Sequence, residues 1–196
     1  MAEIKSAQEI AREKIAKLGE ATPEEILSWK YVPEGEKLAA RYLKDDVNLT
    51  TELSQYQDEN IRKHVTKGAE EVLIRNISLP RNDAAKKENR RIMEALKALK
   101  HDKVAAENVF SKMRRIFSHY VGPGEEQRKE AYEQLKIDFT AKLRQAMQQQ
   151  GLGMNARINI EQQPEFQAEW RRMSSRLEGQ YQEHLEEYKK ELSAVV

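Results

Sequence analysis

The sequence predicts an all-α protein, an elongated antiparallel three-helix coiled-coil-like bundle with additional short N-terminal helices. Glycine and proline are scarce, with eight and five among 196 residues, and the helix-favouring residues Ala, Glu, Lys, Gln, Leu and Arg are abundant. Apolar side chains recur every three or four residues over long stretches, which is the period of a packed helix. Segments rich in glycine or proline separate these stretches and mark the expected helix ends.

The strongest periodicity lies between residues 83 and 120, and it predicts one unbroken helix. Its inward positions follow one another at alternating steps of four and three, the 3.5-residue period of a coiled coil. These positions are Ala85, Asn89, Ile92, Leu96, Leu99, Lys103, Ala106, Phe110, Met113, Phe117 and Tyr120. Such a stripe buries one narrow face of the helix against other helices.

Two further long helices complete the predicted bundle. Val121-Gly-Pro-Gly124 is a break, and because this connection is short, we expect the next helix, over 125–149, to run antiparallel to the first. A last helix is expected over 164–192. Its inward positions at heptad spacing are Phe166, Trp170, Met173, Leu177, His184, Tyr188 and Leu192.

Residues 1–80 are predicted to form several shorter helices. One is expected over 3–18, and Thr22-Pro-Glu-Glu25 is a capping box that starts another. That second helix should end near Trp29 or Lys30, because Pro33 disfavours helix just before it. Helices over 34–44 and from Thr50 or Thr51 to about residue 72 follow. We therefore divide the chain into a short-helix region, 1–80, and a long-helix bundle, 81–196, within one continuous fold.

Two segments alternate β-branched and polar residues in the manner of strands, 72–79 and 156–161. Each is followed by a proline and then by a long predicted helix. The two segments could pair as a small ribbon between helices. The favoured interpretation is that the first is the end of a helix and the second an extended linker.

Composition limits the classes of function. Cysteine is absent, which excludes disulfides and thiolate catalysis. The first residues do not resemble a signal peptide, and no apolar stretch approaches the roughly 18 residues that cross a bilayer, so we expect a cytoplasmic protein. The formal net charge is +1. Residues 81–120, however, carry 11 basic and 5 acidic groups, a local net charge of +6.

The basic outer face of the 81–120 helix is the leading candidate for a functional surface. Its cations fall outside the apolar stripe, where they could attract phosphate groups or an acidic partner. They are Lys86, Lys87, Arg90, Arg91, Lys97, Lys100, Lys112, Arg114 and Arg115. The plainer interpretation is a solvated helix face that balances the acidic ends of the chain. No nucleic-acid motif or regular aromatic interleaving accompanies these cations.

Two smaller groups of residues have either a functional or a purely structural role. Asn89 and Lys103 lie within the apolar stripe, where they either set register and pair across helices or are simply tolerated near a bundle end. Trp29 and Tyr31 belong to a dense cluster of large side chains in a predicted loop. This cluster is either a docking loop or a plug that packs short helices onto the bundle.

No residue pattern indicates catalysis, a metal or a cofactor. His64, His101, His119 and His184 are scattered; none follows a glutamate by three residues, and no two lie four residues apart. The sequence therefore predicts a non-catalytic protein without a metal or cofactor.

Two segments resemble an uncharacterised family of small prokaryotic all-helical proteins. They are Glu3-Ile-Lys-Ser-Ala7 and Lys30-Tyr-Val-Pro-Glu-Gly-Glu-Lys-Leu-Ala-Ala-Arg-Tyr-Leu43. The resemblance covers most of the chain. It implies a helical fold and brings no activity, ligand or functional residue.

Three functional hypotheses follow. The first is a helical interaction or scaffold protein that self-associates, as a homo-oligomer, or binds a protein partner, because long heptad seams suit association. The alternative is nucleic-acid binding through the basic outer face of helix 81–120. The third is an enzyme or metal protein with a site inside the bundle.

Overall fold

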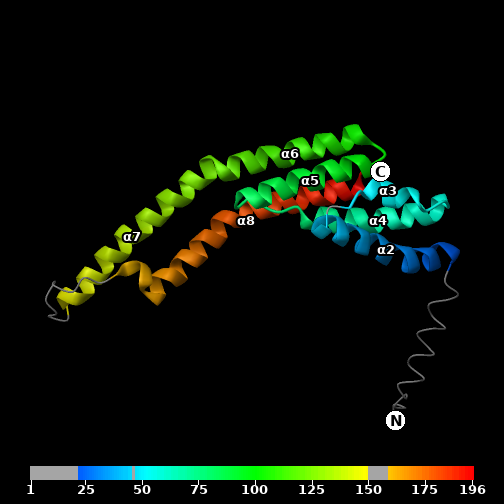
Figure 1. The fold of residues 1–196 in the computed structure, drawn as a ribbon. Helices are drawn as coiled ribbons and strands as arrows, with labels where there is room; N and C mark the ends of the chain where they lie inside the picture. Colours follow the sequence, from blue (N-terminus) through cyan, green and yellow to red (C-terminus); the bar gives the residue numbers. More distant parts are fainter. Residues whose placement is uncertain (1–21, 46, 150–158) are drawn as a thin grey trace, which may run out of the picture. The chain divides into compact units, whose positions relative to one another are not determined.

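The computed structural model describes residues 22–45, 47–149 and 159–196 (Figure 1). Its elements are α2 (Pro23–Asp45), α3 (Leu49–Ser54), α4 (Glu59–Asn76), α5 (Asp83–Leu99), α6 (Lys103–Val121), α7 (Pro123–Gln149), the 3₁₀ turn η1 (Ile160–Gln162) and α8 (Pro164–Ala194). The described ranges contain no strand, so the all-α prediction is confirmed. The helix predicted over 3–18 lies outside these ranges.

The chain divides into two compact units, residues 1–73 and 74–196. The described part of the first unit contains α2, α3 and most of α4. The second contains the end of α4 and all elements from α5 to α8. Each unit buries apolar side chains, such as Leu38 and Val65 in the first and Ile92 and Phe110 in the second.

Helix α2 is a single helix of 23 residues with Pro33 inside it, so the prediction of two short helices was wrong. Its start agrees with the predicted capping box: the Glu25 amide donates to Thr22 Oγ1 at 3.2 Å, and the Thr22 amide donates to Glu25 Oε2 at 2.8 Å. As a result, Trp29 and Tyr31 lie on a helix rather than in a loop. Trp29 is exposed and Tyr31 is half-buried.

Close packing against α4 explains why α2 continues past the proline. A Cβ atom added to Gly35 would lie 1.9 Å from the Val65 carbonyl oxygen, and one added to Gly68 would lie 2.0 Å from the Val32 carbonyl oxygen. Only residues without a side chain allow the two backbones to approach so closely. This contact involves the residues on both sides of Pro33, and it offsets the roughly 3 kcal/mol that an interior proline costs a helix.

The helix predicted from Thr50 or Thr51 to residue 72 is two helices, α3 and α4. Asn48, rather than a threonine, caps α3, and its Oδ1 accepts from the Thr51 amide at 3.1 Å. Asp58 Oδ1 accepts from the Asn60 amide at 2.8 Å and so starts α4. Short polar side chains begin helices because they accept hydrogen bonds from the free backbone amides of the first turn.

The favoured interpretation of 72–79 as the end of a helix is confirmed, and the strand alternative is not: α4 continues to Asn76, and residues 77–81 then have no regular structure. Asn89 of α5 fixes this segment. Its Nδ2 donates to the Ser78 carbonyl oxygen at 2.6 Å, and its Oδ1 accepts from the Ser78 amide at 3.0 Å. The second candidate, 156–161, lies partly outside the described residues, and its last two residues belong to η1.

The predicted unbroken helix over 83–120 is instead a helical hairpin of α5 and α6, which lie side by side (Figure 1). Lys100 ends α5 in an extended conformation, with φ −67° and ψ 136°. Asp102 Oδ1 then accepts from the amides of Val104 and Ala105 at 3.1 and 2.9 Å, which starts α6. Both helices keep most of the predicted stripe buried or half-buried, whereas Lys103 at the turn is exposed.

The prediction that the helices on either side of Gly122 run antiparallel was also wrong. Figure 1 shows α6 and α7 following one bent path. Gly122 alone leaves the helical conformation, with φ −102° and ψ −104°, and its amide still donates to the Ser118 carbonyl oxygen at 3.1 Å. Pro123 then begins α7, where no amide donor is needed. The antiparallel neighbour of both helices is α8.

Aromatic packing joins α7 to α8. Phe166 is buried and meets Tyr132 and Phe139 edge-on, at centroid distances of 5.6 Å. His184, predicted to face inward, is exposed, and its neighbour Leu185 is buried instead. A straight helix drifts from an exact 3.5-residue repeat, so the inward position moves by one residue.

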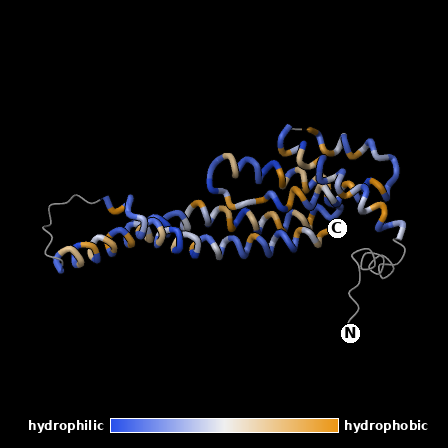
Figure 2. The backbone as a smooth tube through the Cα atoms, turned by 90° about the horizontal axis from the view of Figure 1, so that it is seen from below, coloured by the Kyte–Doolittle hydropathy of each residue, from blue (hydrophilic) through white to orange (hydrophobic). Residues whose placement is uncertain are grey.

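The helices are amphipathic, as Figure 2 shows from the alternation of hydrophobic and hydrophilic residues along them. None of the helices in the described ranges is both long and apolar enough to span a bilayer.

Candidate functional site

The predicted basic face does not exist as one helix face, because its residues lie on both arms of the α5–α6 hairpin and in the turn. Lys100, in the turn, is only 4% exposed, and its Nζ donates to the Val195 carbonyl oxygen at 2.6 Å. It holds the turn against the C-terminal residues and is not part of an outer surface. Arg91 is half-buried, and Lys87 and Arg115 are exposed.

Four of the nine predicted cations instead line a groove between α5 and α6, with a volume of about 490 Å³. The other polar residues that line it are Asn89, Glu94, Glu107 and Ser118. Its apolar residues are Pro80, Met93, Phe110, Phe117 and Val121, and its cations are Lys86, Arg90, Lys97 and Arg114. The groove therefore joins an apolar floor to a basic rim, a combination that binding sites commonly use.

The groove follows the axes of both helices. On α5 its lining extends from Lys86 to Lys97, and on α6 from Glu107 to Val121. At about 1.5 Å per residue, these spans correspond to roughly 16 and 21 Å. The surface is thus an elongated channel of three to four helical turns rather than a round pocket.

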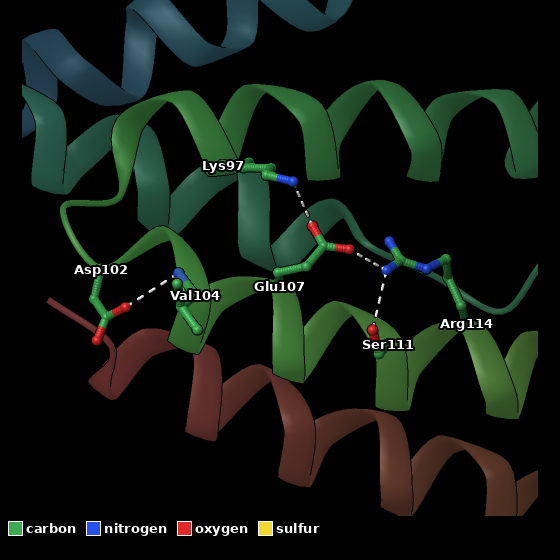
Figure 3. A network of polar contacts seen from close by, with 6 residues as sticks. All are labelled: Lys97, Asp102, Val104, Glu107, Ser111 and Arg114. Carbon is green, nitrogen blue, oxygen red and sulfur yellow. Dashed lines mark hydrogen bonds and ion pairs between the residues drawn. The ribbon is translucent and has the colours of Figure 1, made fainter.

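Glu107 of α6 connects the two sides of this groove (Figure 3). Lys97 Nζ of α5 donates to Glu107 Oε2 at 2.8 Å, and Arg114 Nη2 donates to Glu107 Oε1. These hydrogen bonds lower the pKa of the Glu107 carboxyl below its ordinary value. The bond from Lys97 has the larger effect, and the bond from Arg114 the next largest. Glu107 is therefore ionised at neutral pH. Its carboxylate forms ion pairs with two of the four rim cations, Lys97 and Arg114.

The remaining rim cations differ in their partners. Lys86 Nζ lies 3.0 Å from Asp83 Oδ1 on the same helix. Arg90 is exposed and makes no ion pair with any residue in the described ranges. The four cations exceed the two lining carboxylates, those of Glu94 and Glu107, by two charges. The groove thus favours an anionic occupant.

Outside the groove, the other sequence candidates have separate surroundings. Lys112 Nζ lies 2.6 Å from Glu191 Oε1 of α8. Lys30 Nζ lies 4.9 Å from the centre of the Tyr31 ring on α2, while Trp29 is exposed. The Trp29 and Tyr31 cluster belongs to the first unit, and the cations of the α5–α6 hairpin belong to the second.

A polar cluster at the α6–α7 bend was missed by the sequence analysis. Tyr120 Oη donates to Glu178 Oε1 at 3.0 Å, and Arg81 Nη2 donates to Glu178 Oε2 at 2.7 Å. The Arg128 guanidinium lies 4.1 Å from the Tyr120 ring centre. Burial is the main cause that raises the pKa of Tyr120, and the hydrogen bond to the negatively charged Glu178 carboxylate raises it further. Tyr120 is therefore a neutral hydrogen-bond donor that fastens the bend to α8.

No local signal could have found this cluster, because Tyr120 and Glu178 are 58 residues apart in the chain. In the described ranges, no group of three or more His, Asp or Glu side chains is placed to hold a metal ion.

The fold defines an all-α helical protein whose second unit carries a basic-rimmed groove. The model of the family described as "Family of unknown function (DUF6657)" matches residues 50–194, and the chain belongs to that family. The resemblance to a helical family without a known function is thereby confirmed. No curated protein and no solved structure matches the chain. The matched region includes every residue of the groove.

Proposed function

We propose that the protein is a non-catalytic interaction protein of the cytoplasm, which binds a protein partner in the groove between α5 and α6. The observation that carries this proposal is the joining of an apolar floor and a basic rim along two packed helices. Phe117 in the floor is only half-buried in the free chain, so a partner that covered it would remove further apolar surface from water.

The chemistry of the lining supports recognition rather than catalysis. The carboxylate of Glu107 is held ionised between two cations, which makes it a poor proton donor at neutral pH. Protonated Lys and Arg side chains have no lone pair with which to accept a proton. The groove is thus suited to binding charge and apolar surface together.

Nucleic-acid binding remains the alternative, and the net charge of +6 over residues 81–120 favours it. Lys97, Lys112 and Arg114 each hold a carboxylate in the structure, which reduces the charge that is free for phosphate. We therefore place the protein partner first.

The test compares two tryptophan substitutions on the same helix. Ser118 is exposed and lines the groove, so Ser118→Trp fills the groove without disturbing the core. Val104, 73% exposed, lies outside the groove, so Val104→Trp adds the same side chain elsewhere. Tagged full-length chains would be isolated from the source cells and analysed by mass spectrometry and light scattering.

We expect the wild type and Val104→Trp to carry the same protein partner in a fixed ratio, and Ser118→Trp to lose it. A monomer without any partner in all three samples would overturn the proposal. Equal retention of the partner by Ser118→Trp and Val104→Trp would show that the groove is not the binding surface. Equal helicity of the three proteins by circular dichroism controls for folding.

A further inference from the structure

We infer that the element bound in the groove is an acidic amphipathic helix of the partner, lying along α5 and α6 as a third helix. This inference rests on the proposed function and specifies the chemistry of the partner.

The shape of the groove fits a helix. Its lining follows both helix axes for three to four turns, and two floor residues, Phe110 and Phe117, are seven positions apart on α6. That separation is about 10.5 Å along the axis, the distance after which the apolar face of a second helix also repeats. A helix laid along this channel would set apolar side chains against Phe117 and Val121, the half-buried floor residues, which lie beside the buried Met93 and Phe110.

The charges of the groove fit acidic flanks on that helix. Cations lie on both sides, Lys86, Arg90 and Lys97 on α5 and Arg114 on α6, while the lining has a net charge of +2. Arg90 makes no ion pair within the described ranges. Carboxylates beside the apolar face of the partner would meet these cations, whereas lysines there would be repelled.

Glu107 takes the place of a partner carboxylate in the free chain. It holds Lys97 and Arg114 from opposite helices (Figure 3), the arrangement that an incoming acidic side chain would adopt. An acidic helix therefore competes with Glu107 for these two cations. Removing the Glu107 charge should strengthen binding, a result that a merely structural ion pair does not predict.

The experiment uses the full chain and a synthetic 18-residue fluorescein-labelled helix, with leucines at alternating three- and four-residue steps and glutamates on both flanks. A twin peptide carries lysine at every glutamate position. Fluorescence anisotropy measures the binding of each peptide to the wild type and to Arg90→Glu, Lys87→Glu, Glu107→Gln and Ser118→Trp. Lys87 is the matched control, because it is exposed and adjacent to the groove residues but does not line the groove.

We expect the glutamate helix to bind at least about tenfold more tightly than its lysine twin. Arg90→Glu should weaken binding of the glutamate helix by about fivefold or more, and Lys87→Glu should change it less than about twofold. Glu107→Gln should tighten binding by about threefold. Ser118→Trp should abolish it.

Several results would overturn the inference: no binding of the glutamate helix, equal binding of both peptides, or equal effects of Arg90→Glu and Lys87→Glu. A 20-base-pair DNA duplex could also displace the peptide. If Arg90→Glu and Ser118→Trp weakened DNA binding and Lys87→Glu did not, nucleic acid would be the occupant instead. Displacement by a second copy of the chain would identify that copy as the occupant. If Ser118→Trp abolishes partner capture in cells while the acidic peptide fails to bind, the proposed function stands and this inference fails.

Discussion

Two polar side chains within the apolar stripe, Asn89 and Lys103, have different environments in the structure. The sequence predicts Asn89 and Lys103 as polar interruptions of one stripe, which either set register and pair across helices or are simply tolerated near a bundle end. The structure separates them: Asn89 is buried and bonds to Ser78, whereas Lys103 is exposed at the start of α6. The difference arises because α5 ends at Leu99, so Lys103 is a terminal residue and not an interior one.

Asn89→Ala should lower the free energy of unfolding by about 1–3 kcal/mol. The substitution leaves both the amide and the carbonyl of Ser78 without their side-chain partner in a partly buried place. Urea unfolding followed by circular dichroism measures the change. Lys87→Ala, at an exposed position of the same helix, should stay within about 0.5 kcal/mol of the wild type. Equal stability of the two variants would contradict the role of Asn89.

Glu107→Gln should reduce stability at neutral pH but not in acid. The pKa of Glu107 is lowered from 4.5, so its contribution is present above the pKa of the unfolded chain and is lost as the pH falls through the lower folded pKa. The side chain is 38% exposed, so the difference at pH 7 should be below about 1 kcal/mol. Thermal unfolding of both proteins between pH 7 and about pH 3 tests this. A difference that does not shrink in acid would contradict it.

At the scale of elements, the helical segment from α5 to α7 is interrupted twice, and the chain reverses at the first interruption but only bends at the second. Lys100, His101 and Asp102 are all non-helical, and the chain reverses there to form the α5–α6 hairpin. Gly122 is the single non-helical residue between α6 and α7, and the chain only bends. One non-helical residue that keeps a helical hydrogen bond changes the direction of a helix, whereas three residues and a new aspartate cap allow a full turn.

The α2–α4 contact makes the substitution of one of its glycines costly, whereas an exposed glycine of α8 should tolerate a side chain. Gly35→Ala should destabilise the protein by about 2 kcal/mol or more, because its Cβ would lie 1.9 Å from the Val65 carbonyl oxygen. Gly179→Ala in α8 should stabilise it by about 0.5–1 kcal/mol, because nothing lies within 4 Å of the added Cβ. Thermal unfolding of the two variants gives the comparison. Unchanged or increased stability of Gly35→Ala would contradict the close contact, and lower stability of Gly179→Ala would contradict the open surroundings of that position.

At the scale of the whole molecule, charge is balanced overall and compensated locally. The chain has a formal net charge of +1, and cations of the basic hairpin hold Asp83, Glu107 and Glu191. Long-range attraction of polyanions is therefore weaker than the count of basic residues suggests.

Size-exclusion chromatography with light scattering should find the chain with a protein-like ratio of absorbance at 260 and 280 nm. The reason is that ion pairs occupy much of the charge that would otherwise bind nucleic acid. A multiple of the 22.8 kDa chain mass would show that the chain associates with itself. An excess of absorbance at 260 nm that disappears at high salt would contradict the expectation and put nucleic acid first.

The sequence by itself determined the helical class, the start of α2 at the Thr22 capping box, and most positions of the buried stripe between Asn89 and Tyr120. These features depend on residues within one or two turns of each other, so local periodicity and capping are sufficient to predict them. It also identified four cations that line the groove, although it placed them on the face of a single helix.

Only the tertiary structure decided where helices continue, bend or reverse. Whether α2 passes Pro33 depends on Gly68, and whether two helices or one follow residue 83 depends on packing across the hairpin. The groove exists only because α5 and α6 pack side by side, which also brings Lys97 of α5 to Glu107 and Arg114 of α6. A helix end is a balance of a few kcal/mol between local preference and distant contacts, and the distant contacts are not written in any short stretch of sequence.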